Sequence, residues 1–269
     1  MGSSETICEN FCYFIYKCKK KDIVQYYNNV IIIDHYNLKY FFILFLFILV
    51  LNIVSFTRGI KRLSSNERDL ILIPDDLKEV LIGILLGDGH IARRSLMSNS
   101  RLVYAQSGIK NKEYFYHVYN LFKIFCTNEY KPYYKISKDN RTEKFYTSIS
   151  FTTMQLPCFN IYRESFYYLH TKKVPDNIYE LLTAKGLAFW IMDDGSRHGD
   201  GLHISTYAFS SNDIDKLMFV LEDKFKLKCS IHYNKEKKPR IYIFKESMSN
   251  LISLVSHYFI KEMLYKLGL

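Results

Sequence analysis

Two aspartates, Asp88 and Asp194, stand near the ends of two similar apolar segments. The first segment reads LIGILLGDG and the second LAFWIMDDG, so each apolar run ends in an acid that is followed by glycine. If the two segments form helices that pack side by side, both carboxylates reach the same end of the contact. Two carboxylates held close together repel each other unless a hard divalent cation lies with them. The pair therefore predicts metal-assisted hydrolysis of a phosphodiester.

The residues around these acids favour helices that approach each other closely. Gly83 and Gly87 lie four residues apart, which puts both on one face of a helix as a small-residue stripe. Pro74 followed by two acids is typical of a helix start, and the glycine after each motif acid is typical of a helix stop. We expect helices over Leu77–His90 and Thr183–Asp194.

The elements that follow each motif repeat in kind and order, as strand, helix, hairpin and helix. After the first motif they are Arg101–Ser107, Asn111–Cys126, the hairpin Tyr130–Lys138 with Lys144–Thr153, and Phe159–Leu169. After the second they are His203–Tyr207, a helix capped at Ser211-Asn212-Asp213 that runs to Phe225, the hairpin Cys229–Lys235 with Pro239–Lys245, and the helices Ser247–Tyr258 and Lys261–Leu267. The repeat predicts a duplicated unit with halves at 71–176 and 177–269.

Charge and composition indicate a polyanionic partner. The chain of 269 residues carries a net charge of +10, which on a globular protein favours nucleic acid. Aromatic residues reach 16% and Lys, Asn and Ile are plentiful, which is typical of an AT-rich genome such as that of an organelle. The six cysteines form no C-x-x-C pair, so we expect free thiols in a reducing compartment. The spacing of His90, His198 and His203 matches no common zinc site.

Residues 1–70 differ from the rest and are expected to form a leader with a hydrophobic segment at 40–56. This segment is long enough for a marginal membrane helix. A dispensable leader, such as the translated remnant of an upstream reading frame, is the alternative. A signal peptide is not expected because the apolar run starts far from the N-terminus.

The two motifs resemble the paired signatures of the LAGLIDADG homing endonucleases. The second, which ends W-x-M-D-D-G, is similar to the form in single-chain yeast mitochondrial members. The resemblance also rests on YAQS followed by KNKEY, and on KPRIYI followed by ESMSNL. It covers the chain from about Pro74 to the C-terminus, and nothing in residues 1–70 belongs to the family pattern.

The resemblance implies an α+β fold of two pseudo-symmetric αββαββα half-domains with the motif helices at their interface. Two antiparallel sheets would form a saddle over the DNA major groove. Asp88 and Asp194 would bind Mg²⁺, or Mn²⁺ in its place, helped by the backbone carbonyls of Gly87 and Asp193. Members of the family cut both strands of a long site across the minor groove and leave short 3′ overhangs.

Further site residues follow from the same resemblance. Gln106 looks like one of the polar residues around the metals, and the matching strand of the second half offers Ser205 and Thr206. A basic residue follows each half: Lys266 in the second, and Lys172 in the first with Lys173 as the alternative. Positive charge there would offset the attacking hydroxide and the transition-state phosphate.

Two positions depart from the signature. Phe189 stands where the first motif has Gly83, so we expect less small-residue character on that side of the helix contact. Leu86 replaces the signature's first acid, which is structural. Neither departure touches Asp88 or Asp194.

Side chains on the predicted strands are candidates for contact with DNA, because long basic and amide side chains on a sheet reach base edges or phosphates. A solubilising charged surface is the alternative interpretation. The candidates are Arg101, Tyr104, Tyr134, Lys135, Lys138, Tyr146, His232, Asn234, Lys235, Arg240 and Tyr242.

The first hypothesis is therefore a Mg²⁺-dependent, site-specific endonuclease that cuts a long double-stranded DNA target and promotes intron mobility. We expect it to be a monomer encoded and acting in a mitochondrion, with a chloroplast as the alternative. The second hypothesis is a group I intron maturase, an RNA-binding splicing cofactor on the same scaffold, with the host intron RNA as partner. The third is a membrane-associated protein defined by residues 40–56.

Overall fold

The computed structural model describes residues 63–127 and 131–269. Ser64–Leu269 form one compact unit, and the hydrophobic segment expected at residues 40–56 lies outside the described residues. Within the described ranges, no helix has both the length and the apolar character needed to span a bilayer. The short helix α4 (Ser65–Asp69) opens the unit, with Ser64 and Glu67 forming a reciprocal cap.

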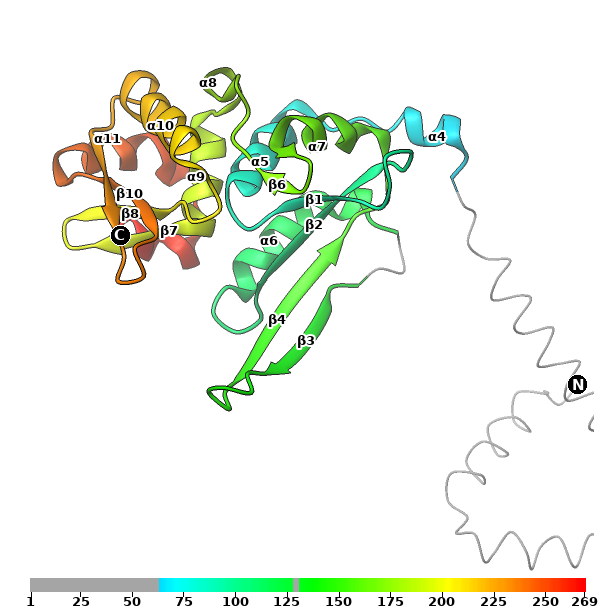
Figure 1. Ribbon diagram of the computed structural model, residues 1–269, viewed down its shortest axis with the longest axis horizontal. Helices are drawn as coiled ribbons and strands as arrows, with labels where there is room; N and C mark the ends of the chain where they lie inside the picture. Colours follow the sequence, from blue (N-terminus) through cyan, green and yellow to red (C-terminus); the bar gives the residue numbers. More distant parts are fainter. Residues whose placement is uncertain (1–62, 128–130) are drawn as a thin grey trace, which may run out of the picture. The chain divides into compact units, whose positions relative to one another are not determined.

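Helices α5 (Asp75–Leu86) and α9 (Ala184–Asp194) carry the two motifs and lie side by side at the centre of the unit (Figure 1). Helix α5 begins directly after Pro74, with two acids in its first turn, as the sequence predicts. Thr183 caps α9, where its hydroxyl oxygen accepts a hydrogen bond from the Gly186 N–H at 3.2 Å. Residues 80–86 of α5 and 186–193 of α9 are all buried, whereas the first turns of the two helices carry charged residues and stay partly exposed.

The contact between α5 and α9, called the seam here, is tight because glycine faces it. A Cβ atom on Gly83 would lie 2.2 Å from the Gly186 carbonyl oxygen and 2.8 Å from Cβ of Phe189. A Cβ atom on Gly87 would lie 2.4 Å from Oδ2 of Asp193. The predicted small-residue stripe is confirmed, and Gly186 supplies the close approach that Phe189 was expected to weaken.

Helix α5 ends earlier than predicted. The sequence indicated helix to His90, whereas the last helical residue is Leu86. The Asp88 N–H leaves the helical pattern and donates to Oδ2 of Asp193 on α9 at 3.0 Å. The Gly89 N–H then reaches back to the Ile84 carbonyl oxygen at 2.7 Å. Because the Asp88 N–H bonds across the seam, the chain turns out of the helix before the acid.

Each half follows its motif helix with two hairpins separated by a helix, so the expected αββαββα order is confirmed. The first half forms an antiparallel sheet of order β1-β2-β4-β3 and the second a sheet of order β7-β8-β10-β9. The bounds in the first half are β1 His90–Arg93, β2 Ser100–Ser107, α6 Lys112–Phe122, β3 Tyr133–Lys138, β4 Phe145–Thr152 and α7 Asn160–Phe166. In the second half they are β7 Gly195–His198, β8 Gly201–Ser205, α10 Ser211–Phe219, β9 Cys229–Tyr233, β10 Pro239–Ile243 and α11 Lys245–Val255.

Short elements connect these parts. They are the single-turn helices η1 Lys123–Phe125 and η2 Pro157–Phe159, the ribbon β5 Tyr167–Tyr168 with β6 Thr171–Lys172, α8 Ile178–Leu181, the π-helix η3 Val220–Lys224, and the 3₁₀ helices η4 Ser256–Tyr258 and η5 Lys261–Lys266. Three expectations need correction. The helix expected to reach Leu169 gives way to β5, the cap of α10 is Ser210 and not Ser211, and α10 becomes a π-helix at Val220.

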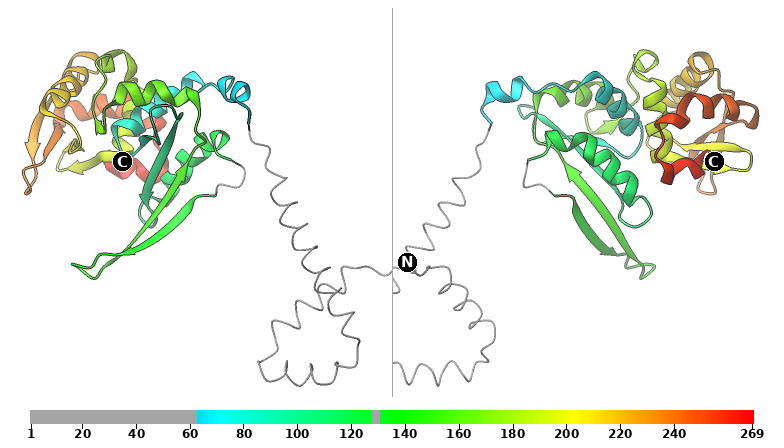
Figure 2. Two further views of the ribbon diagram at one scale, coloured as in Figure 1. Left: turned by 45° about the vertical axis from the view of Figure 1, so that its right-hand side comes forward. Right: turned by 180° about the vertical axis from the view of Figure 1, so that it is seen from behind.

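The first half extends further from the seam than the second. Its β3–β4 hairpin projects beyond the helices, whereas β9 and β10 stay close to theirs (Figures 1 and 2). Every residue of β3 is exposed, while β9 and β10 are half-buried. The tip of the first hairpin therefore has little core beneath it.

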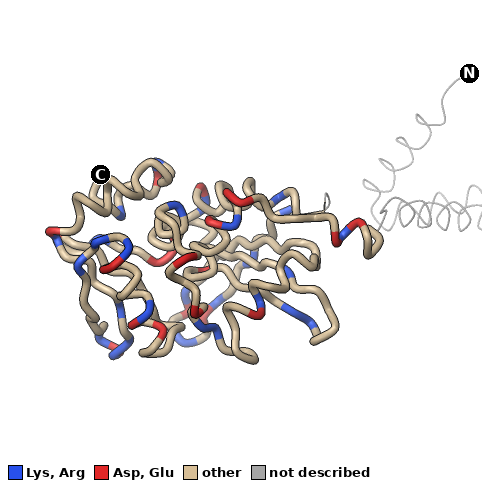
Figure 3. The backbone as a smooth tube through the Cα atoms, turned by 90° about the horizontal axis from the view of Figure 1, so that it is seen from above, with Lys and Arg blue, Asp and Glu red and all other residues tan. Residues whose placement is uncertain are grey.

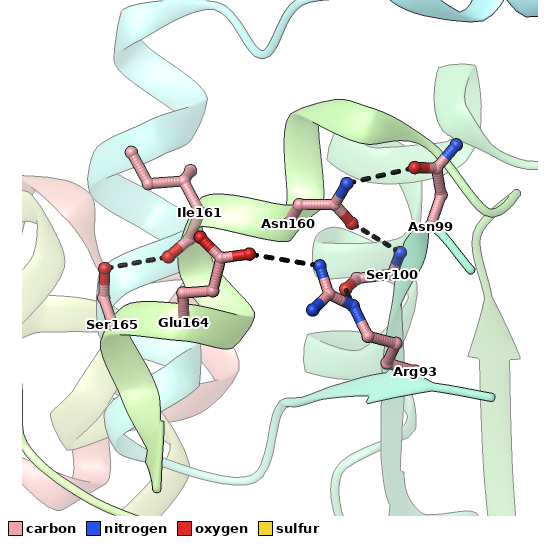
Figure 4. Close-up of polar contacts among 7 residues, drawn as sticks. All are labelled: Arg93, Asn99, Ser100, Asn160, Ile161, Glu164 and Ser165. Carbon is pink, nitrogen blue, oxygen red and sulfur yellow. Dashed lines mark hydrogen bonds and ion pairs between the residues drawn. The ribbon is translucent and has the colours of Figure 1, made fainter. Parts of the chain in front are cut away.

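Polar contacts fasten α7 to the first sheet (Figure 4). Arg93 donates to Glu164 at 3.2 Å, and the Ser100 N–H donates to Oδ1 of Asn160 at 2.8 Å. The Asn160 amide in turn donates to Asn99 at 3.0 Å. These bonds hold the ends of β1 and β2, so the strands that follow the first motif have a fixed position.

Candidate active site

Asp88 and Asp194 meet at the same end of the seam. Asp194 is the last residue of α9, and Asp88 lies directly beyond α5. Burial first and the Asp88 charge next raise the pKa of Asp194 to about 7. The surrounding protein atoms also raise the pKa of Asp88 by displacing water, although this residue stays exposed on one side, and the hydrogen bond from Gln106 opposes that rise. The two carboxylates are close enough to repel each other, as the sequence predicts.

Lys172 and Lys266 place positive charge at the ends of the two motif helices. The Lys172 ammonium donates to the carbonyl oxygens of Gly87 at 2.8 Å and Gly89 at 3.0 Å. The Lys266 ammonium donates to the carbonyl oxygens of Met192 and, at 3.0 Å, Asp193. Helix C-termini leave carbonyls without partners and carry partial negative charge, so each lysine satisfies both needs.

Burial lowers the pKa of both lysines, to about 8 for Lys172, and the nearby aspartates oppose this change. Lys173, the alternative in the first half, donates its backbone N–H to the Phe166 carbonyl oxygen at 2.8 Å, and its side-chain charge acts on Asp176. The structure therefore places Lys172 at the site, in the position that Lys266 takes in the second half.

Gln106 lies beside the acid of its own half. Its side-chain amide nitrogen donates to Oδ2 of Asp88 at 2.6 Å, and its carbonyl oxygen accepts from the Asn111 amide at 2.7 Å. Only 6% of the residue is exposed. Because one end of the amide is held by Asn111, the other end is held against the Asp88 carboxylate.

The Asp193 side chain is a member of the site that was not predicted from the sequence. The family resemblance implied a role only for the backbone carbonyl of this residue. The carboxylate instead lies in the seam, where it accepts from the Tyr104 hydroxyl at 2.7 Å and the Asp88 N–H at 3.0 Å. Burial and the Asp88 charge raise its pKa well above the usual range. An acid at the position matched by Gly87 was the sequence signal that could have revealed it.

The two halves do not match at Gln106. In the sheets, His90 pairs with Val103 and Ser196 pairs with His203, so Gln106 corresponds to Thr206 rather than Ser205. The Thr206 hydroxyl is buried and donates to the Pro239 carbonyl oxygen at 3.0 Å. The Thr206 hydroxyl therefore bonds within its own sheet, and the Asp194 carboxylate has no amide donor that matches Gln106.

The site offers hard oxygen atoms for a cation. Among the described residues, no group of three or more His, Cys, Asp and Glu side chains is placed to hold a metal ion. A cation here would thus need backbone carbonyls and substrate oxygens beside two carboxylates, a donor set that Mg²⁺ accepts. The carbonyls of Gly87 and Asp193 each accept from a lysine, and a carbonyl oxygen has a second lone pair free.

The residues of the first sheet that were predicted to contact DNA lie on two different faces of it. Cross-strand pairs show that Arg101, Lys135 and Tyr146 share the open face of the first sheet, while Tyr134 and Lys138 lie on the opposite face. Tyr104 is fully buried and bonded to Asp193, so its prediction as a DNA contact is wrong. Lysines and arginines occur over both halves, interspersed with acids (Figure 3).

A histidine-rich cavity of about 760 Å³ opens on the second sheet and includes His232, Asn234, Lys235 and Arg240 from the predicted contacts. The rings of His198 and His203 lie 4.3 Å apart, and the rings of His232 and Tyr242 stack at 4.5 Å. Burial and the neighbouring histidines lower the pKa of His203 to about 4. The cavity therefore presents a neutral imidazole beside the guanidinium of Arg240.

Comparison with known proteins agrees with the fold. The model of the LAGLIDADG DNA endonuclease family matches residues 78–251. Cytochrome b mRNA maturase bI2 of Saccharomyces cerevisiae is 31% identical over 202 residues, which cover 72% of this chain and 47% of that protein. The same maturase of Debaryomyces hansenii is 31% identical, over 72% of this chain and 74% of its own. The chain thus spans about half the length of the Saccharomyces relative.

Two further relatives are named as endonucleases. Intron-encoded endonuclease ai4 of Dictyostelium discoideum is 40% identical over 54% of this chain and 93% of its own. The structure of the homing endonuclease I-WcaI bound to its DNA recognition sequence matches with a TM-score of 0.70 and 27% identity, over 78% of this chain and 95% of that one. The paired motif helices, the two αββαββα halves and these matches together place the chain in the LAGLIDADG DNA endonuclease family.

Proposed function

We propose that this protein is a site-specific DNA endonuclease that cuts both strands of a long duplex target with the help of Mg²⁺. Mn²⁺ is the alternative cation. The observation that carries this proposal is the pair of acids, Asp88 and Asp194, at one end of the seam with a lysine beside each. The names of an endonuclease relative and of the DNA-bound structural neighbour support DNA as the substrate.

The residues present fit a divalent cation. The Asp194 carboxylate is mostly buried beside a second acid, and no hydrogen bond to it is recorded among the described residues. Such a pair is unfavourable at neutral pH unless protons or a cation compensate the charge. When bound, Mg²⁺ would polarise the scissile phosphates and make an attacking water more acidic.

The protein's own groups supply orientation and charge. Gln106 holds the Asp88 carboxylate through its 2.6 Å hydrogen bond. The ammonium groups of Lys172 and Lys266 face the aspartates from the helix ends and would offset negative charge that develops on the phosphate. The open sheet faces, with Arg101 and Lys135 in one half and Arg240 in the other, would bind the DNA on either side of the acids.

The test is a cleavage assay on the intronless junction of the host gene. We expect Asp88→Asn and Asp194→Asn each to lower the cleavage rate by about 10³-fold or more, because each removes a charge that holds the cation. Duplex binding measured with Ca²⁺ should survive. Cutting by both variants at the wild-type rate would refute the assignment, and Ser249→Ala on the exposed face of α11 is the control.

The second candidate is a maturase, which is favoured by two relatives named as cytochrome b mRNA maturases that each cover 72% of this chain. Splicing on this scaffold requires no metal chemistry at the two acids. The double variant Asp88→Asn with Asp194→Asn, assayed for DNA cutting and for splicing of the host intron, distinguishes the two functions. Loss of cutting with retained splicing would show that the protein has both activities. Retention of cutting and splicing together would rule out the nuclease role of the two acids.

The oligomeric state and the cellular location are part of the same proposal. We propose a monomer with halves at 71–176 and 177–269, because both motif helices and both acids belong to one chain. The maturase names support a mitochondrial origin, with a chloroplast as the alternative. Size-exclusion chromatography with light scattering tests the monomer, and fractionation of the full chain tests membrane association through residues 40–56.

A further inference from the structure

The Gln106 amide has a fixed orientation that comes from three oxygen atoms around its nitrogen. These are Oδ2 of Asp88 at 2.6 Å, the Tyr104 hydroxyl at 3.0 Å and Oδ1 of Asp193 at 3.2 Å. The Tyr104 hydroxyl hydrogen is used in its own bond to Asp193 at 2.7 Å. A rotated amide would point its oxygen at two carboxylates, so the surroundings select the donor for Asp88.

The second half lacks every part of this arrangement. Following the strand pairing, Tyr104 corresponds to Ile204 and Gln106 to Thr206, while Asp193 corresponds to Gly87 in the first motif. Ile204 is fully buried and apolar, and the Thr206 hydroxyl is bonded to Pro239. Asp194 therefore has no amide of this kind, although its lysine neighbour matches that of Asp88.

We propose that Tyr104 and Asp193 are positioning residues that hold the Gln106 amide against Asp88, a support that Asp194 lacks, so that the two strands of the DNA are cut by unequal half-sites. Asp193 also accepts directly from the Asp88 N–H. This inference rests on the proposed nuclease function. Tyr104 is fully buried and so cannot touch DNA itself. Its loss would release the amide from one of its three partners and leave the Asp194 half-site as it was. A nicked duplex should then accumulate.

The test uses the full chain and a duplex target with each strand separately labelled, under single-turnover conditions with Mg²⁺. We expect Tyr104→Phe to slow one strand about tenfold and the other less than about twofold, because the hydroxyl's bond to the Asp193 carboxylate and its bond from the Gln106 amide are both lost. Tyr167→Phe is the matched control. It also deletes one buried hydroxyl contact, with the Ile91 N–H at 3.0 Å, but away from Gln106.

A metal-free measurement keeps the inference independent of activity. The side-chain NH₂ signals of Gln106, identified by their loss in Gln106→Met, should shift in Tyr104→Phe and in Asp193→Asn but not in Tyr167→Phe. Asp193→Asn guards against a folding defect in one variant, because an amide in place of the carboxylate keeps the shape and has one acceptor oxygen fewer.

The outcomes separate the two proposals. If the wild-type chain cuts neither strand, the nuclease function is rejected. The shifts of the Gln106 NH₂ signals would then show whether Tyr104 and Asp193 position the amide. A wild-type chain that cuts, with Tyr104→Phe slowing both strands equally or no more than Tyr167→Phe, would overturn the inference while leaving the nuclease intact.

Discussion

The two halves share a fold but differ in how they hold their acids. In the first half, Gln106 bonds Asp88 and is itself held by Asn111 and by residues in the seam. In the second half, Thr206 is turned toward its own sheet, and Asp194 faces charge chiefly from the two lysines and Asp88. A duplicated chain has thus kept the acid and lysine of each unit while the polar support of the acid has diverged.

The largest difference in cleavage rate between the halves should come from substitutions at the matched strand positions Gln106 and Thr206. We expect Gln106→Met to lower the cleavage rate by about 10- to 100-fold, because the hydrogen bond to the Asp88 carboxylate is lost without a change in volume. Thr206→Val should change the rate by less than about threefold. Single-turnover cleavage rates of both variants on the same duplex test this prediction. Equal losses of rate in the two variants would contradict the unequal support of Asp88 and Asp194.

The seam offers a second contrast, in stability. Gly83→Ala should lower the free energy of unfolding by about 1–3 kcal/mol, because its Cβ would lie 2.2 Å from the Gly186 carbonyl oxygen and the helices must shift. Gly186→Ala meets its nearest atom at 3.1 Å, and helix propensity offsets the contact, so we expect a change within about 1 kcal/mol. Urea unfolding measures both. A larger loss for Gly186→Ala would mean that the helices are packed differently.

The smallest effect concerns pH and a cation. The pKa of Asp194 is raised to about 7 from a usual 3.8, so the folded state holds a proton that the unfolded state has lost. This group therefore stabilises the fold fully below about pH 4, and that contribution declines as pH rises to about 7. We expect Ca²⁺ to raise the Tm more at pH 7.5 than at pH 5.5, because protons compete with the cation at the lower pH.

The control for this prediction is a variant of Asp194 that cannot ionise. In Asp194→Asn, the dependence of the Ca²⁺ effect on pH should be reduced. A Ca²⁺ effect that is equal at both pH values in the wild type would show that the two carboxylates do not hold the cation.

Much of the fold was predictable because its signals are local. The two apolar runs, each ending in an acid and a glycine, predicted α5 and α9, and alternating residues predicted β2 and the hairpins. Strands β1 and β7 were missed because each has four residues of which only one is buried, which leaves no alternation to detect. The early end of α5 depends on a bond from Asp88 to Asp193, and no local pattern contains that bond.

The site divides along the same line. Asp88 and Asp194 were predicted from the two motifs, and the family resemblance implied Gln106, Lys172 and Lys266. The structure brings all five together. The roles of Tyr104 and the Asp193 side chain depend on a contact between one half's strand and the other half's helix. Tyr104 reads from sequence as an exposed strand residue, because alternation shows that two faces exist and not which face is covered.

The central claim is that Asp88 and Asp194 together hold divalent cations against the DNA. The most direct measurement is anomalous diffraction from crystals of the chain with its target duplex and Mn²⁺. We expect anomalous peaks at about 2.2 Å from carboxylate oxygens of both residues. Peaks elsewhere, with these two side chains pointing away from any ion and from the phosphates, would contradict it.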